Sequence, residues 1–147
     1  MISKPHASEM MNNEFGNAAY SMPTTYYVGL STTPVEYATG LGFTEPSGVG
    51  YARASIANAT ENWELDENGY VKNKTIVEFP LFDTTLAGTN VAYWFIAANA
   101  AANAEGDKAL YFGQLLDASG APVEFPIVSG GRVYIPAGNI QLGRTNA

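Results

Sequence analysis

Short runs in which apolar and polar side chains alternate dominate the chain after Pro23. In TTYYVGLST, for example, Tyr26, Val28 and Leu30 would share one face of an extended strand. The pattern occurs about eight times, at spacings typical of sandwiches and barrels and too short for βαβ units. The other runs are YARASI, NKTIVEFPLF, NVAYWFIAA, KALYFGQLLD, APVEFPIV, GRVYIPAG and NIQLG. The sequence therefore predicts an all-β fold, an antiparallel β-sandwich of jelly-roll-like type.

Three of these segments allow sharper predictions. NVAYWFIAA is apolar on both faces, which is typical of a central strand. KALYFGQLLD is its expected partner, across the loop NAAANAEGD. In ENWELDENGY, the dipeptide Asn68–Gly69 is a strong signal for a tight hairpin turn.

The N-terminal segment has a different period. Met10, Met11 and Phe15 fall near one face of a helix, which Ser8 would cap and Gly16 would end. We expect a short amphipathic helical arm over residues 8–16. It could dock on its own sandwich or pack on a neighbouring subunit, and in the second case these three apolar residues would be interface residues.

Composition limits the possible functions. A length of 147 residues fits a single domain, 1–147. The formal net charge of −7 argues against nucleic acid as a partner, because phosphate binding needs clustered Lys and Arg. No apolar run is long enough for a membrane span or a signal peptide, so no membrane partner is expected. The absence of cysteine excludes disulfides and thiolate metal sites.

Groups suited to catalysis are scarce. His6 is the only histidine and lies in a polar segment, so we expect it at the surface. None of the common hydrolase, zinc-protease or phosphate-loop motifs occurs. The acids of ENWELDENGY resemble a calcium loop only partly, because Thr75 stands where a bidentate Glu is needed. The sequence therefore predicts a protein without enzymatic activity, catalytic residues, metal or cofactor.

Arg53 stands among small residues in TEPSGVGYARASI, directly after a bend formed by proline and glycine. It needs an acidic partner or an outward position. One interpretation is an exposed or cross-strand ion pair, worth about 0–1 kcal/mol. The other is a salt bridge that anchors an assembly, which would make Arg53 an interface residue.

The aromatic residues also have two interpretations. Trp63, Tyr70 and Trp94 could form an exposed platform on which a glycan stacks, as in a carbohydrate-binding module. They could equally be core and interface residues of a sandwich, which is the more common role. An exposed, coplanar pair of rings would favour glycan binding, whereas buried rings with an apolar self-contact patch would favour a structural role.

Several of these motifs occur together in one family. The segments NEFGNAAYSMPTTYYVGLSTTPV, TEPSGVGYARASI, NATENW, IVEFP and KALYFGQLLD resemble, in order and spacing, the small tail-fibre-like structural proteins of tailed bacteriophages. This resemblance implies a virion protein made in the host cytoplasm, either a decoration protein of the capsid or a fibre-like part of the tail. Its expected partners are copies of itself, as a homotrimer or other homo-oligomer, and the major capsid or tail proteins. Host-receptor binding through a glycan is the alternative function.

Overall fold

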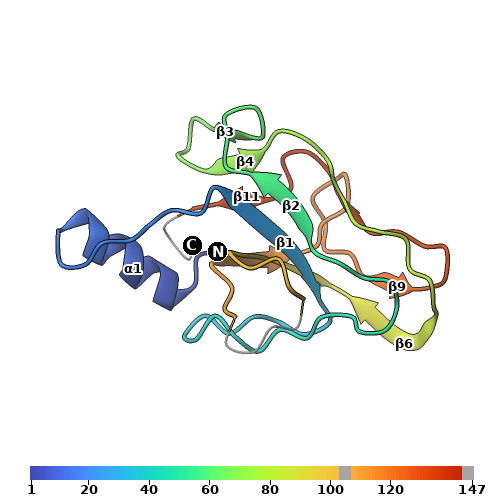
Figure 1. Cartoon of the computed structure of the whole chain (residues 1–147). Coiled ribbons are helices and arrows are strands. Elements are labelled where there is room, and N and C mark those ends of the chain that lie inside the picture. Colours follow the sequence, from blue (N-terminus) through green and yellow to red (C-terminus); the bar gives the residue numbers. More distant parts are fainter. Residues whose placement is uncertain (103–106, 144–147) are drawn as a thin grey trace.

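The computed structural model describes residues 1–102 and 107–143 (Figure 1). Most of its regular structure is β, arranged in antiparallel sheets with one short N-terminal helix. The predicted fold class is therefore confirmed. No helix in the described part of the chain is long and apolar enough to cross a membrane.

The largest sheet has four antiparallel strands in the order β2-β1-β7-β8. They are β2 (Ala54–Ala57), β1 (Thr25–Ser31), β7 (Tyr93–Ala97) and β8 (Tyr111–Gln114). Strand β7 pairs with β1 on one side and β8 on the other, so the predicted central strand and its partner are both confirmed. Residues 103–106 of the loop predicted between these two strands lie outside the described residues.

Smaller antiparallel sheets complete the β structure. One has the order β11-β4-β3, from β3 (Trp63–Leu65), β4 (Val71–Asn73) and β11 (Gln141–Leu142). The pairing of β3 with β4 confirms the predicted hairpin at Asn68–Gly69. Two further pairs are β5 (Val77–Glu78) with β10 (Tyr134–Ile135), and β6 (Leu86–Val91) with β9 (Phe125–Ile127). The described strands number eleven and not about eight, partly because NVAYWFIAA divides at Ala92 between two sheets.

The main core lies between one face of the four-stranded sheet and the smaller sheets. Its buried members include Val28, Leu30, Ile56, Trp94 and Ile96 from the large sheet and Val77, Val91, Ile127 and Ile135 from the others. A second cluster packs around Phe95 and contains Val35, Ala97 and Ala109. Gly29 of β1 makes room for this cluster, because a Cβ there would lie 2.2 Å from the Phe95 ring. The two layers give the sandwich arrangement that alternation predicts.

Helix α1 (Lys4–Glu14) begins earlier than the sequence suggested. Ser3, not Ser8, holds the N-cap position, and a proline occupies the first turn, where its missing N–H costs nothing. The C-terminal expectation was nearly right, since Gly16 follows the last turn with φ of 72°. Figure 1 shows α1 extending away from the sheets before the chain returns to β1.

Candidate functional sites: a groove, a buried ion cluster and a helical arm

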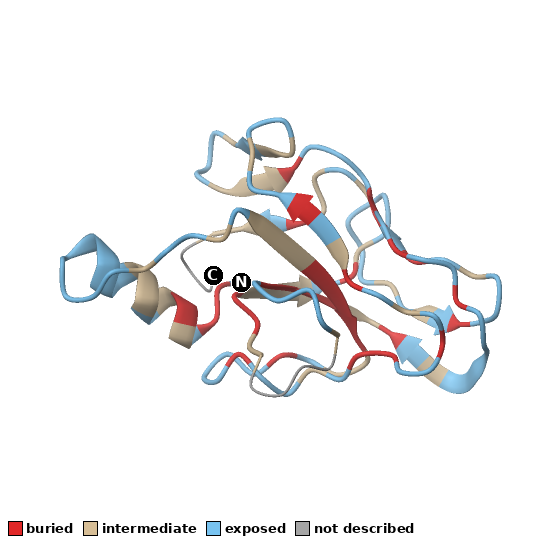
Figure 2. Ribbon diagram, viewed as in Figure 1, coloured by how far each residue is buried: buried red, intermediate tan, exposed pale blue. Residues whose placement is uncertain are grey.

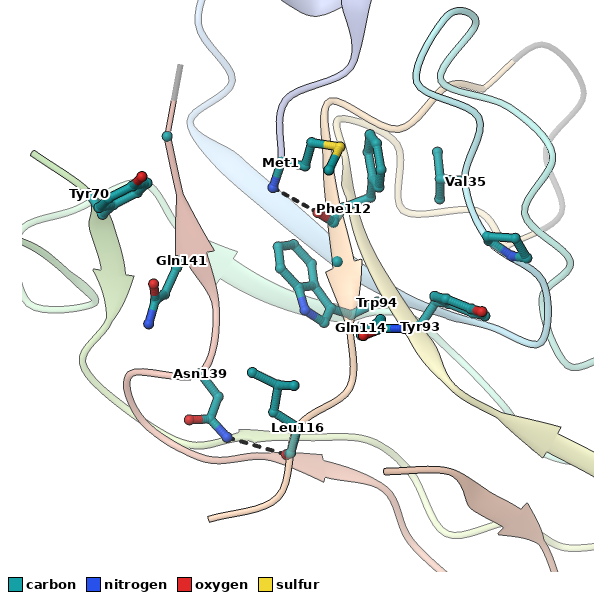
Figure 3. Close-up of a pocket in the computed structure, with 13 residues that line it drawn as sticks. Met1, Val35, Tyr70, Tyr93, Trp94, Phe112, Gln114, Leu116, Asn139 and Gln141 are labelled. Atoms are coloured by element: carbon teal, nitrogen blue, oxygen red, sulfur yellow. Dashed lines mark hydrogen bonds between the residues drawn. The ribbon is translucent and has the colours of Figure 1, made fainter. Parts of the chain in front are cut away.

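A groove of about 520 Å³ lies beside the outer edge of β8 and faces β11 across its width (Figure 3). Its lining comes from distant parts of the chain. The lining residues are Met1, Pro34, Val35, Tyr70, Tyr93, Trp94, Phe112, Gly113, Gln114, Leu116, Asn139, Gln141 and Gly143. The volume is typical of ligand pockets, which span roughly 300–1,000 Å³.

The side chains that line this groove carry no formal charge, but the α-ammonium group of Met1 does. None of the described residues that line it has an Asp, Glu, Lys or Arg side chain. The amino group of Met1 donates to the Phe112 carbonyl at 2.9 Å. The chain has two glutamines, Gln114 and Gln141, and both line the groove with exposed side chains. The amide of Asn139 is fixed, because its Nδ2 donates to the carbonyls of Leu116 and Asp117 at 3.2 and 2.9 Å.

Trp94 occupies the middle of the groove wall, between Phe112 and Asn139 in Figure 3. It is only 3% exposed. Its indole Nε1 donates to no acceptor within residues 1–102 and 107–143. Among the described residues the buried side-chain nitrogen or oxygen atom without a partner is Ser3 Oγ, so the Trp94 N–H is a donor that solvent in the groove can reach.

The three aromatic residues proposed for glycan stacking do not form one exposed platform. Trp63 is half-buried, donates from Nε1 to the Ala57 carbonyl at 3.2 Å, and meets Tyr26 edge to face. Tyr70 is half-buried and lines the groove, as does the buried Trp94. Tyr93, Gln114 and Gln141 also line the groove, and sequence reasoning did not point to the two glutamines.

Arg53 is buried inside the chain, and its ion pairs are not on the exposed surface. Its guanidinium forms a fork-like pair with Glu45, from Nε at 2.8 Å and from Nη2 at 2.9 Å. Nη1 contacts Asp107 and donates to the Asn99 carbonyl at 2.7 Å. The side chains of Arg53 and Glu45 are both fully buried. The interpretation as an exposed pair is therefore wrong.

The segment TEPSGVGYARASI supplies most of this cluster. The bend between Glu45 and Tyr51 returns the chain so that Tyr51 donates to Glu45 at 2.8 Å and accepts from the Leu30 N–H at 2.9 Å. Burial opposes the charge of Arg53, but the hydrogen bonds and charges of Glu45 and Asp107 raise its pKa overall. Burial also raises the pKa of Tyr51, as does the Glu45 carboxylate. The cluster holds the bend against the sheet as a fixed, charged unit.

The base of helix α1 is docked on the β domain. His6 is 2% exposed, so the expectation of a surface histidine was wrong. Its ring meets Tyr20 and Tyr111 edge to face, at centroid distances of 5.5 and 5.1 Å. Burial lowers the pKa of His6, although the nearby Glu9 acts in the opposite direction. Glu9 also binds Lys108 at 2.8 Å, which connects the helix to the segment before β8.

The outer end of the same helix is exposed, as Figure 2 shows. Met11 and Phe15 are 52% and 69% exposed, and Met22 follows on the return segment with similar exposure. Met10 is half-buried. We call Met11, Phe15 and Met22 the arm tip. The two interpretations of the helix thus apply to different parts: its base packs on its own domain, and its tip leaves apolar side chains in solvent.

Acidic side chains do not gather into a metal site in the part of the chain that the structure describes. In the segment that partly resembles a calcium loop, Asp66 instead accepts the backbone N–H groups of Asn68 and Tyr70, both at 2.9 Å. It also pairs with Lys72 at 2.9 Å. These bonds shape the hairpin turn.

The described structure has an antiparallel β body and an arm with an apolar tip. Comparison with known protein families identifies the family of the chain. The family model described as Podophage GP4 fiber I protein gp80 matches residues 1–143. The chain belongs to this family. It is therefore a phage fibre protein and part of the virion, as the sequence resemblance implied. No curated protein matches the chain.

Proposed function

We propose that this protein is a structural subunit of the tail fibre that assembles with copies of itself and docks on the particle through its helical arm. The observation that carries the proposal is the exposed apolar arm tip. Large apolar side chains that gather on a surface commonly mark contacts with other chains. The role needs no catalysis, in agreement with membership of a structural fibre family.

The division within helix α1 supports this role. His6 and the Glu9–Lys108 pair hold the base, so the tip is presented in a defined direction. A presented apolar tip loses less conformational freedom on binding than a loose tail would. Symmetry then repeats the same modest contact around a homotrimer or other closed oligomer, and the repeated contacts strengthen docking on the particle.

The aromatic residues favour this role over an exposed glycan platform. Trp94 is buried and the Trp63 indole is hydrogen-bonded to its own chain. Family membership favours the tail over the capsid as the site of docking. Decoration of the capsid is the competing location, and a binding experiment can distinguish the two.

The first test is the oligomeric mass of the purified protein by light scattering. We expect a stable oligomer for the native chain, and a smaller species for a variant that carries both Met11→Ser and Phe15→Ser. Leu65→Ser is the matched control, because Leu65 lies in β3 and is 70% exposed, close to the 69% of Phe15. The control should leave the mass unchanged.

The second test uses phage particles that lack this protein. Native protein should saturate their tails at a fixed copy number, and the arm-tip variant should not. A native protein that is monomeric at all concentrations and does not bind particles would contradict the proposal. Binding to isolated capsids instead of tails would replace the tail role with decoration.

A further inference from the structure

We propose that the arm tip of one copy of the chain binds in the groove between β8 and β11 of another copy. Phe15 would enter the groove as an aromatic anchor, and Met11 and Met22 would pack on its walls. The proposal rests on the assembly role proposed above and names the surface that receives the arm. The contact joins two unlike surfaces, so the tips of different copies do not meet one another.

The arm tip points away from the groove of its own chain. Met1 lines the groove, and Ser3 holds the N-cap position of α1, so the arm begins beside the groove. The eleven residues of α1 then place the tip about 16 Å from this base, at 1.5 Å per residue. Figure 1 shows α1 leading away from the sheets. A groove that covers the tip therefore belongs to another copy.

The walls of the groove suit the side chains of the tip. The aromatic rings of Tyr93, Trp94 and Phe112 line a space of about 520 Å³ (Figure 3). Methionine side chains fill irregular gaps and make favourable contacts between sulfur and aromatic rings, and the tip has two exposed methionines. Aromatic side chains that fill a pocket commonly dominate the binding energy of an interface, and Phe15 is available for that role. The groove therefore offers the tip apolar contacts that solvent does not.

The charges of the two surfaces are complementary. In the described lining of the groove the charged group is the α-ammonium of Met1, which donates to the Phe112 carbonyl. In segment 10–24 the charged side chain is Glu14, in the last turn of α1. A carboxylate is unfavourable at that end of a helix, where the helix dipole is already negative, and no basic residue occupies this turn. A positive group from another copy would relieve this conflict.

A bundle of arms is the competing arrangement. In it the tips of several copies would meet one another and bury Met11 and Phe15 without using the groove. The same approach would bring the Glu14 carboxylates of neighbouring copies together, and like charges repel. The groove offers a positive group in place of a second carboxylate, so charge favours the groove over the bundle.

Cysteine crosslinking tests the contact directly, because the native chain has no cysteine. Asn12→Cys places a thiol on an exposed position of the arm and leaves the three side chains of the tip unchanged. Gln114→Cys places a thiol on an exposed position of the groove. The two single variants are co-expressed and mildly oxidised, and mass spectrometry identifies the linked peptides. We expect a disulfide that joins position 12 of one copy to position 114 of another.

Ser55→Cys is the matched control for the groove variant. Ser55 is exposed in β2, which lies at the opposite edge of the same sheet from β8. Co-expressed with Asn12→Cys, it should give roughly tenfold less crosslinked product, because no docking holds the two thiols close together. Asn12→Cys alone should give equally little, because the tips lie in separate grooves.

The charge of the tip has a test of its own. Glu14→Gln should weaken self-association about two- to fivefold, because the tip loses its attraction to the Met1 ammonium. Glu61→Gln is the matched control, since it removes an exposed carboxylate from outside the groove. Burial lowers the pKa of the Met1 amino group, so both variants are compared with the native chain at about pH 6, where this group is charged.

Three results would overturn the proposal. One is a crosslink between positions 12 and 114 that is no more abundant than the control. Another is efficient crosslinking of Asn12→Cys with itself, which would assign the tip to a bundle of arms. The third is a Glu14→Gln variant that associates at least as tightly as the native chain, because the change then only removes the conflict with the helix dipole.

The double arm-tip variant separates this proposal from the assembly role. If Met11→Ser with Phe15→Ser lowers the oligomeric mass while positions 12 and 114 do not crosslink, the arm joins copies through another surface and the groove contact alone is refuted. If the double variant leaves the mass of a stable oligomer unchanged, the assembly role of the arm is refuted as well.

Discussion

Replacing Arg53 by methionine should destabilise the protein strongly. Methionine keeps much of the side-chain bulk but removes the guanidinium. The change deletes both bonds to Glu45, the contact with Asp107 and the bond to the Asn99 carbonyl. It removes the guanidinium from the fully buried Glu45 carboxylate and leaves the hydrogen bond from the Tyr51 hydroxyl in place. Breaking a buried ion pair from one side costs about 3–5 kcal/mol, because the remaining charge is uncompensated.

That cost is large relative to the total stability of a domain, which is about 5–15 kcal/mol. For a chain of this length, 1 kcal/mol corresponds to roughly 2–4 °C in Tm, so Arg53→Met should lower Tm by roughly 6–20 °C. Thermal unfolding followed by circular dichroism measures this shift. Protein concentration must be held constant, since assembly stabilises the folded chain by mass action.

The matched control is Arg132→Met. Arg132 is exposed and lies 3.8 Å from Glu78, so its loss should change stability by no more than about 0.5 kcal/mol. A second comparison adds Glu45→Gln and Asp107→Asn to Arg53→Met. The two amides remove the carboxylate charges that Arg53 balances in the native chain, so part of the decrease in Tm should be reversed. Equal effects of Arg53→Met and Arg132→Met would refute the reasoning, as would a triple variant less stable than the single one.

Two further predictions concern packing and pH. Gly29→Ala should lower the free energy of unfolding by about 1–3 kcal/mol, because the added Cβ would lie 2.2 Å from the Phe95 ring. That ring already stacks on Phe43, with 4.2 Å between the ring centroids. An unchanged unfolding midpoint would show that the ring can move freely. Stability should fall as pH drops below about 6.5, because burial holds the pKa of His6 below its unfolded value and the unfolded chain then binds the extra proton. Glu9, whose pKa is lowered by Lys108 and His6 despite burial, stays charged over this window. His6→Phe should flatten the pH dependence of the free energy of unfolding between about pH 7.5 and 5.5, as measured by denaturant titration. A pH dependence of unchanged slope in this variant would exclude His6 as its source.

Alternation and turn chemistry were sufficient to predict much of the fold. The central position of β7 follows from its apolar residues on both faces, and the hairpin between β3 and β4 follows from Asn68–Gly69. These features are local, so a sequence pattern contains them. The start of α1 was placed wrongly because Ser8 is a good cap residue, whereas the proline after Lys4 is the stronger signal.

The sites depend on contacts between distant segments, which a single sequence does not reveal. Glu45 is only eight residues from Arg53, but Asp107 is 54 residues away. His6 is buried because Tyr111 packs on it from the far end of the chain. The groove collects residues from at least five segments, and its one signal in the sequence is that both glutamines of the chain belong to it.

The connections of strand β8 link the arm to the sheet. Ser3 donates to the Leu110 carbonyl at 2.9 Å, Ile2 forms an isolated bridge with Tyr111, and Phe112 donates to the Met1 carbonyl at 2.9 Å. The residues just before α1 therefore extend the edge of the four-stranded sheet. A force applied to the arm tip would pass through these bonds into β8 and then into the central strand β7. Because hydrogen bonds across a sheet share such a load, an arm anchored in this way is consistent with the proposed role of joining copies in a fibre.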